Sequence, residues 1–590
     1  MAEARSAVAE PRVTKIDEGR DSWHDFLIAW RKSIFRRYFR TRNSIRNGMW
    51  PTSLYNLAIA FGILCTLTLW EPRFAVRINN WLWYLEAVLR LPKCKLTSAE
   101  FNIRGTVSLP YLLRVGVIAW IAGIVFFILL MCIRQYLLRI LLTYRGWMFE
   151  RPNIQSKTTL IWAITVRLIS GYQPSLYSCQ KSLPRLPVPP LKQTLKKLIE
   201  SLRPVSTDEE IEILKQESKE FEKSLGPKLQ KILMLKSWWS QNYVTDWWEK
   251  YVYLMGRTPI SNNSNYYCLD HSYWFASPSQ VSRASNILHL VLKFKRMIDR
   301  EELEPLVIRG TIPICMAQFE RLLSTVRVPG EDVDEVLHFD SKDSKHIVVV
   351  SDNIYYKLDV YDSKDQILSP TSFENQIKWI MEDSNKHKET CTDEEKSISS
   401  LTALDRTEWA RIRKKHFLSG VNHETMQLIE KSILLLWLPD YSPNNFVERG
   451  KWLLHGDGRS MWFDKSFNLV IFKNGRAGFN CEHSIADAPA MSMIWEYAMT
   501  KEVVEKVYDE DGHCLPLCLP FRQALFKSPQ RLIWQVEPEL GVKIQNAVTF
   551  AQTLRKNKLD NSTFNAPPTQ SDSHESRMWK AIYANAICHI

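Results

Sequence analysis

Two long uncharged segments dominate the hydrophobic pattern of the chain. Pro51 to Trp70 contains twenty residues without a charge, and Val115 to Ile133 contains nineteen. A helix of about that length covers the ~30 Å hydrocarbon core of a bilayer. Arginine and aromatic residues bracket both segments, as they do at membrane boundaries. We therefore expect a transmembrane hairpin of two helices, 51–70 and 115–133, the alternative for each being a buried core helix.

Basic residues flank the predicted hairpin on both outer sides. Those before the first segment are Arg31, Lys32, Arg36, Arg37, Arg40, Arg42 and Arg46, and those after the second are Arg134, Arg139, Arg145 and Arg151. The intervening loop, 71–114, is also basic, so the bias is modest. Because positive flanks stay on the cytosolic side, the pattern favours a hairpin with both termini cytosolic.

The segment ahead of the hairpin, 1–50, has the pattern of an amphipathic helix. Its apolar residues Trp23, Phe26, Leu27, Trp30 and Ile34 recur at intervals of three and four, with arginine and lysine between them. Such a helix lies on a membrane or docks onto the rest of the protein. A cleaved transit peptide is the alternative, and the four acidic residues between positions 17 and 25 disfavour it.

Helical and strand-like patterns alternate beyond residue 133. Thr207 to Leu225 and Asn286 to Asp299 have helical periodicity, whereas His346 to Val350 and Tyr355 to Val360 predict strands. The charged, weakly apolar stretch Met381 to Ser399 predicts a surface loop or linker. Mixed elements around a large core indicate an α/β body.

One histidine follows a strongly strand-like run. Phe467 to Phe472 is apolar and β-branched, and Asn474-Gly475 is a tight-turn signal, after which the chain returns to His483 with Asp487 four residues on. A neutral imidazole held at the end of a sheet can accept the proton of an alcohol and prepare it to attack an acyl carbonyl. The alternative is a buried histidine whose partners are backbone groups.

The surrounding motifs resemble those of the choline/carnitine acyltransferase family, and within it the carnitine palmitoyltransferase 1 group. EHSIADAP, with DKSF before it and IWEY after it, is similar to the active-site segment of that family. The other matching motifs, in order along the chain, are SLPRLPVPP (182–190), LKSWWSQNYVTDWWEKYVYL (235–254), NSNYY (263–267), IPICMAQFERLLSTVRVPG (312–330), DSKHIVVV (343–350) and LTALDRTEWARIR (401–413).

The resemblance implies a two-lobed body with a mixed sheet and helices, similar to chloramphenicol acetyltransferase, that binds acyl-CoA and carnitine as substrates. His483 would be the general base that accepts the carnitine hydroxyl proton, and Asp487 would support its loop through an ion pair with a later arginine. The resemblance also implies the mitochondrial outer membrane and a role in fatty-acid import. Glu3 matches the group, but Arg5 stands where a histidine is usual, which leaves malonyl-CoA inhibition open.

The tryptophan-rich motif has two readings. Trp238, Trp239, Trp247 and Trp248 form two pairs nine residues apart. Paired tryptophans of this kind most often anchor a core or the packing of two lobes. A lining for an acyl chain is the alternative.

Composition narrows the function classes further. The net charge of +13 suits polyanionic molecules such as acyl-CoA or anionic lipid, and no nucleic-acid-binding motif accompanies it. Eleven irregularly spaced cysteines argue against a disulfide framework. His513, Cys514 and Cys518 alone resemble metal ligands, but no second pair completes a zinc motif, so we expect no metal and no cofactor.

The expected domains are the N-terminal segment 1–50, the spans 51–70 and 115–133 with the loop 71–114, a catalytic body 134–555 and a divergent tail 556–590. Since the tail is polar and unlike the family, the second lobe is expected to be incomplete. Two functions follow: a membrane-bound carnitine O-acyltransferase, or a catalytically impaired membrane module with a regulatory or partner-binding role. Homo-oligomerisation is left open.

Overall fold

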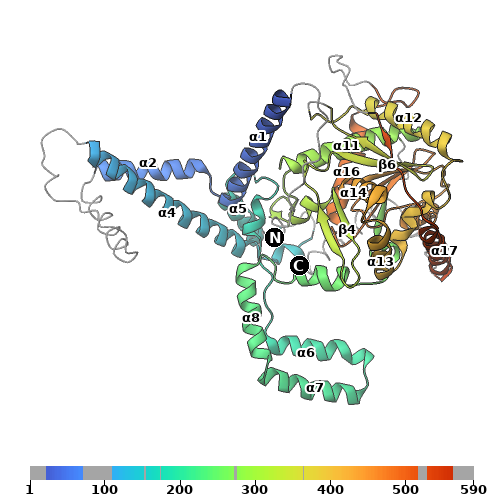
Figure 1. Ribbon diagram of the computed structural model, residues 1–590. Coiled ribbons are helices and arrows are strands. Elements are labelled where there is room, and N and C mark those ends of the chain that lie inside the picture. The colour runs from blue at the N-terminus through green and yellow to red at the C-terminus, as the bar shows by residue number, and fades with distance from the viewer. Residues whose placement is uncertain are drawn as a thin grey trace. The chain divides into compact units, whose positions relative to one another are not determined.

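The computed structural model describes residues 22–70, 109–151, 155–172, 174–271, 276–362, 365–505, 507–515 and 528–561. The chain divides into two compact units, Met1–Ser182 and Leu183–Ile590 (Figure 1). The sequence predictions that concern Glu3, Arg5, Cys518, most of the loop 71–114 and most of the tail 556–590 lie outside the described residues.

The first unit is helical. Its elements are α1 (Ser22–Met49), α2 (Leu54–Trp70), α4 (Leu109–Leu141), the 3₁₀ turn η3 (Gly146–Phe149), α5 (Lys157–Ser170) and the 3₁₀ turn η4 (Ser178–Ser182). Helix α4 packs against α2 at Gly123, where a Cβ atom would lie 3.7 Å from the Cα of Phe61. Gln135 of α4 holds the segment that follows α1, because its side-chain amide donates to the Trp50 carbonyl at 2.8 Å.

One of the two expected spans passes the test of length and composition. Within the described residues, the helical stretch Trp120–Phe149 is long and apolar enough to cross a membrane, with a mean hydropathy of 2.2 in its most apolar window. The apolar helix Leu54–Leu64 is shorter. The two-span hairpin therefore stays a prediction.

The second unit is a mixed α/β body, in agreement with the predicted fold class. Its helices are α6 (Leu191–Leu202), η5 (Arg203–Val205), α7 (Asp208–Lys223), α8 (Gly226–Trp239), α9 (Thr245–Trp248), the π-helix η6 (Glu249–Leu254), α10 (Ile260–Asn263), α11 (Gln280–Asp299), η7 (Ala317–Arg321), α12 (Pro370–His387), η8 (Glu395–Ala403), α13 (Arg406–His416), α14 (Gly420–Lys431), α15 (Phe446–His455), α16 (Ala488–Val504) and α17 (Pro538–Asn561).

Its strands are β1 (Tyr266–Leu269), β2 (Val307–Ile308), β3 (Ile312–Pro313), β4 (Thr325–Val328), β5 (Glu335–His338), β6 (His346–Ser351), β7 (Ile354–Asp359), β8 (Leu435–Leu438), β9 (Asn468–Ile471), β10 (Ala477–Cys481) and β11 (Gln530–Arg531). Seven of them form one sheet in the order β1-β10-β9-β8-β6-β7-β11. Strands β6, β8 and β9 are parallel neighbours, and the other pairs in the sheet are antiparallel.

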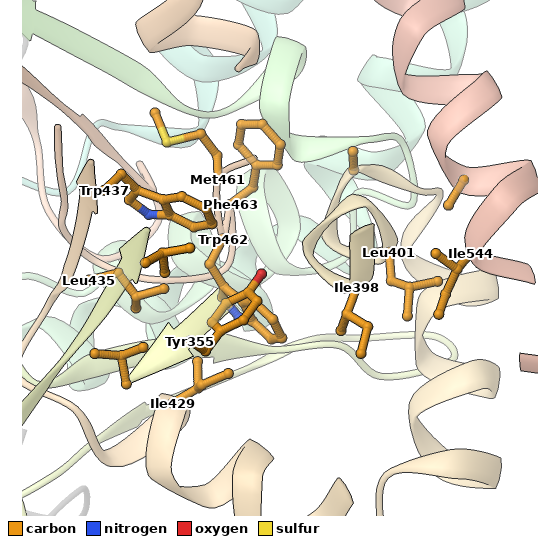
Figure 2. Packing of buried hydrophobic residues seen from close by; sticks show 14 of the residues in the cluster. Tyr355, Ile398, Leu401, Ile429, Leu435, Trp437, Met461, Trp462, Phe463 and Ile544 are labelled. Atoms are coloured by element: carbon orange, nitrogen blue, oxygen red, sulfur yellow. The ribbon is translucent and has the colours of Figure 1, made fainter. Parts of the chain in front are cut away.

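One hydrophobic core cluster lies on one face of this sheet (Figure 2). Val348, Val350, Leu435, Trp437 and Val470 contribute alternate side chains of β6, β8 and β9 to it, as the period of two in a strand requires. Helices that follow later in the chain or connect the strands complete the cluster, through residues such as Ile398 and Leu401 of η8, Ile429 of α14 and Ile544 of α17. The sheet is therefore a rigid support for the loops at its strand ends.

Several predicted elements are confirmed. Helix α7 starts at a capping box in which the Thr207 hydroxyl accepts from the Glu210 amide while the Glu210 carboxylate accepts from the Thr207 amide. Helix α11 covers the predicted 286–299, and β6 and β7 match the predicted strands. The His346 ring donates to the Leu428 carbonyl at 2.7 Å, so this residue at the start of β6 has a backbone partner.

The predicted surface loop at Met381 to Ser399 is wrong at both ends of the stretch, whereas the exposed turn segment 388–394 in its middle agrees with the prediction. Helix α12 continues to His387, and Ser397 to Ser399 are buried in η8. The polar side chains of this stretch bond to the sheet: the hydroxyl of Tyr356 donates to Asp383 at 2.9 Å, and the Ser351 and Ser384 hydroxyls lie 2.9 Å apart. Low apolar content here therefore reflects hydrogen-bonded packing.

The tryptophan pairs are not core residues, which corrects that part of the preferred reading. Trp238, Trp239, Trp247 and Trp248 are all exposed in the second unit. The ammonium group of Lys236 lies 3.6 Å from the ring centroid of Trp247. The Trp247 ring therefore contacts a cation at the surface and is not buried among apolar neighbours.

Candidate active site

The candidate site is the loop between β10 and α16. Strand β9 turns back into β10 through Gly475, which has a φ of +76° and whose Cβ position would lie 2.3 Å from the Ser277 carbonyl oxygen. Only glycine fits this turn. Strand β10 then ends at Cys481, so the next two residues, Glu482 and His483, leave the sheet at a fixed point.

His483 is accessible from solvent. Its side chain is 35% exposed. The Tyr266 ring meets it edge-on with centroids 5.1 Å apart, and the Tyr253 ring centroid lies 5.2 Å away. A buried histidine satisfied by backbone groups, the alternative considered from the sequence, does not describe this position.

Tyr266 also bonds to the backbone of the histidine loop. Its hydroxyl donates to the Ala486 carbonyl at 2.8 Å. Burial raises the pKa of Tyr266 well above its ordinary value, so the hydroxyl keeps its proton. Tyr266 thus serves as a structural support that fixes both the imidazole face and the loop backbone.

Asp487 holds the outer edge of the imidazole. Its Oδ1 lies 3.4 Å from Nε2 of His483. The hydrogen bond from His483 is the main cause of the lowered pKa of Asp487, so the carboxylate is ionised near neutral pH. An anion at Nε2 favours a proton on that nitrogen and leaves the lone pair of the neutral ring at Nδ1.

Gln318, on η7, holds Asp487 in turn. Its amide Nε2 donates to Asp487 Oδ2 at 2.7 Å, and its Oε1 accepts from the Asp487 backbone N–H at 3.1 Å. This two-point contact fixes both the side chain and the backbone of Asp487. The described partners of the carboxylate are thus His483 and Gln318, whereas the family resemblance implied an arginine later in the chain.

Glu482 anchors the loop on its buried side. Its carboxylate accepts from Arg327 Nη1 at 2.8 Å, from the Ser264 hydroxyl at 2.9 Å and from the Ser484 backbone N–H at 3.0 Å. Arg327 also donates through Nη2 to the Tyr253 carbonyl at 2.7 Å. One guanidinium therefore ties the histidine loop to the segment that carries Tyr253.

The anchor extends into a chain of buried charges. Arg327 and Arg406 each donate through Nε to Asp334 Oδ2 at 2.7 Å, and Arg406 Nη1 donates to Asp464 at 2.6 Å. Burial alone would lower the pKa of Arg327, but the carboxylates of Glu482 and Asp334 raise it. The Arg327 guanidinium therefore stays charged, and the alternation of acidic and basic side chains makes the burial of this network tolerable.

The cysteine and histidine cluster singled out in the sequence has other partners. His513 Nδ1 lies 2.8 Å from Glu374 Oε1, and the Cys514 backbone N–H donates to Glu374 Oε2 at 3.0 Å. In the part of the chain that the structure describes, no three His, Cys, Asp or Glu side chains are grouped to hold a metal ion.

Comparison with known proteins gives a family. The model of the family described as Choline/Carnitine o-acyltransferase matches residues 186–569. The liver isoform of carnitine O-palmitoyltransferase 1 from Homo sapiens is 35% identical over 578 residues, which cover 94% of this chain and 70% of that protein. The chain belongs to the choline/carnitine acyltransferase family.

Other relatives agree with this assignment. The muscle isoform of carnitine O-palmitoyltransferase 1 from Sus scrofa is 34% identical over 569 residues, with 94% of this chain and 70% of that protein covered. Carnitine O-acetyltransferase from Rattus norvegicus is 31% identical over 384 residues, covering 62% of this chain and 58% of that protein. The chain is therefore an acyltransferase, of the carnitine O-palmitoyltransferase type.

The acyltransferase site contains residues that sequence reasoning did not single out. Gln318 and Arg327 both lie in the motif 312–330, which was identified only as a family match. Their partners Asp487 and Glu482 are more than 150 residues away in the chain. The family motif 312–330 is the sequence signal that could have indicated Gln318 and Arg327. Neither residue lies at a characteristic spacing from His483.

Proposed function

We propose that this chain transfers a long-chain acyl group between CoA and the hydroxyl of carnitine, with His483 as the general base. One observation carries the proposal: the solvent-accessible imidazole of His483, fixed between two tyrosine rings and an ionised carboxylate, in a chain of this family. The named relatives that act on carnitine supply the substrate class.

The chemistry asked of His483 is a proton transfer. The ring nitrogen that does not face Asp487 accepts the hydroxyl proton while the alcohol oxygen attacks the thioester carbonyl, and the proton then passes to the departing CoA thiolate. A general base contributes about 10²–10⁴-fold to such a rate.

The residues around His483 act by positioning it. Asp487 orients the ring and stabilises the imidazolium that forms during transfer, because its carboxylate lies 3.4 Å from Nε2. Gln318 fixes Asp487, and Glu482 fixes the loop backbone through Arg327.

We further propose that segments 51–70 and 115–133 cross the mitochondrial outer membrane as a hairpin, which places both termini on the cytosolic side. The apolar stretch Trp120–Phe149 and the basic residues Arg134, Arg139 and Arg145 support this placement. Fatty-acid import into mitochondria is the process that such an enzyme would serve.

Substrate dependence tests the proposal. The full chain, purified in detergent and reconstituted in vesicles, should form palmitoylcarnitine and free CoA in equal amounts when palmitoyl-CoA and carnitine are both present. Either substrate alone should give no palmitoylcarnitine. Absence of the product with both substrates, from a chain that remains folded, would contradict the proposal and favour a non-catalytic membrane module.

A further inference from the structure

Helix α5 of the first unit has two apolar faces on opposite sides. At 3.6 residues per turn, Leu160, Ile161, Ile164 and Leu168 fall within an arc of about 100°. Thr159, Trp162 and Val166 lie on the other side of the helix and are buried. A helix that only packs on a protein core needs one apolar stripe, so the second stripe needs another explanation.

The buried face is fixed against the C-terminal end of α4. The Trp162 indole donates to the Leu141 carbonyl at 2.6 Å, and the Tyr144 and Thr159 hydroxyls lie 2.9 Å apart. At the other end of α5, Arg134 Nη2 donates to the Ile169 carbonyl at 2.5 Å. Helix α5 is therefore held alongside the segment 134–144, and the rotation about its axis is set.

The side chains of the open face remain at least half exposed among the described residues. Leu160 is 50% exposed, Ile161 65%, Ile164 50% and Leu168 74%. Four neighbouring aliphatic side chains at this exposure form a contiguous apolar patch on a short helix, which marks a contact with a partner or a membrane.

The position of α5 beside the candidate span indicates that its open apolar face contacts lipid. Tyr136, Leu137 and Ile140 are exposed on the part of α4 beside which α5 is held, so both the candidate span and the neighbouring helix carry exposed apolar side chains. Lys157 begins α5 and Arg167 lies in its last turn. Long basic side chains at the ends of an apolar stripe are typical of helices at the bilayer interface, where they reach the headgroups.

We propose that α5 is a lipid-contacting helix whose face of Leu160, Ile161, Ile164 and Leu168 enters the interface of the bilayer that α4 crosses. This inference rests on the membrane placement proposed above. The bilayer would then hold the first unit through two elements in fixed contact, so that the chain leaves the membrane at Gly171 in a defined direction.

Photocrosslinking to lipid tests this contact in the full chain. Ile161 and Ile164 are replaced singly by p-benzoylphenylalanine, and the protein is reconstituted in vesicles of phosphatidylcholine and phosphatidylserine. Irradiation should give lipid adducts at both positions, detected by mass spectrometry. The matched controls are the same replacement at Phe126, an exposed residue of α4, and at Glu209, an exposed polar residue of α7.

The controls separate the two levels of the proposal. Lipid adducts at Ile161, Ile164 and Phe126, and none at Glu209, support it. Lipid adducts at Phe126 with none at Ile161 or Ile164 would overturn the role of α5 and leave the membrane placement standing. Adducts to protein at Ile161 and Ile164 would overturn it as well, and no lipid adduct at any position would remove the membrane placement too.

Discussion

At the scale of single residues, Asp487 shows how the site takes priority over local helix stability. Asp487 is the N-cap residue of α16, a position where aspartate usually accepts from the amides of the first turn. Its side chain makes no such bond here, because it faces His483 and Gln318. The helix thus forgoes a cap that is worth about 1 kcal/mol elsewhere.

Replacement of Gln318 should weaken catalysis without touching the base. Gln318→Ala removes two hydrogen bonds to Asp487, one of them to a carboxylate, which is worth about 1.5–3 kcal/mol. If that energy orients His483, kcat falls between about tenfold and a hundredfold while KM changes little.

The matched control for this variant is Gln545→Ala, which removes an exposed glutamine–glutamate bond at 2.6 Å far along the chain. Its kcat should equal that of the wild type. Steady-state kinetics of the two variants measure the difference. Equal kcat values for Gln318→Ala and Gln545→Ala would show that the contact with Gln318 is not required for Asp487 to orient His483.

Two of these site residues could be found from the sequence, and one could not. His483 and Asp487 stand four apart after an apolar run and a turn signal, so local spacing and the family motif both point to them. Gln318 reaches Asp487 only because η7 lies against the start of α16. Such a contact depends on the packing of the whole body, which local patterns do not contain.

At the scale of elements, buried charges join β4, α13 and the histidine loop. Arg327 of β4 connects Glu482 to Asp334, and Arg406 of α13 connects Asp334 to Asp464. All five side chains are buried. Removal of one member leaves its partners charged without compensation in a low-dielectric interior.

Arg327→Met should therefore destabilise the body by about 3–5 kcal/mol. Arg411→Met is the matched control, because Arg411 forms an exposed pair with Glu331 at 3.7 Å, a class of pair that contributes little. Urea unfolding, followed by tryptophan fluorescence of the detergent-solubilised chain, measures both. Equal unfolding midpoints for the two variants would refute a structural role for the network.

Element prediction succeeded where local signals were strong. The helical pattern of Thr207 to Leu225 predicted α7, and the apolar, β-branched run that starts at His346 predicted β6. It failed at the start of the stretch Met381 to Ser399, where the side chains of Asp383 and Ser384 bond to β7 and β6. A charged, weakly apolar segment looks like a loop until the partners that satisfy it are known.

At the scale of the whole molecule, two buried histidines link folding to pH. Burial lowers the pKa of His289 and of His346 to about 4 each. Unfolded histidines titrate near 6.5, so the unfolded chain binds more protons between these values. Stability is therefore complete above about pH 6.5 and is lost as the pH falls toward 4, by about 3 kcal/mol per histidine.

His346→Gln tests this pH dependence. The variant removes one titrating group, so the slope of unfolding free energy against pH between about 4 and 6.5 should decrease by about one proton. Urea unfolding at several pH values measures the slope. An unchanged slope would mean that His346 does not contribute, and His416→Gln, at the end of α13, controls for loss of a histidine elsewhere.

The central claim for the whole enzyme is that His483 accepts the proton of the alcohol during acyl transfer. The most direct measurement compares palmitoylcarnitine formation by the wild type, His483→Ala and His416→Ala in the same vesicles. The account predicts that His483→Ala loses about 10²–10⁴-fold in kcat and that His416→Ala retains wild-type activity. A folded His483→Ala variant with wild-type kcat would contradict the account.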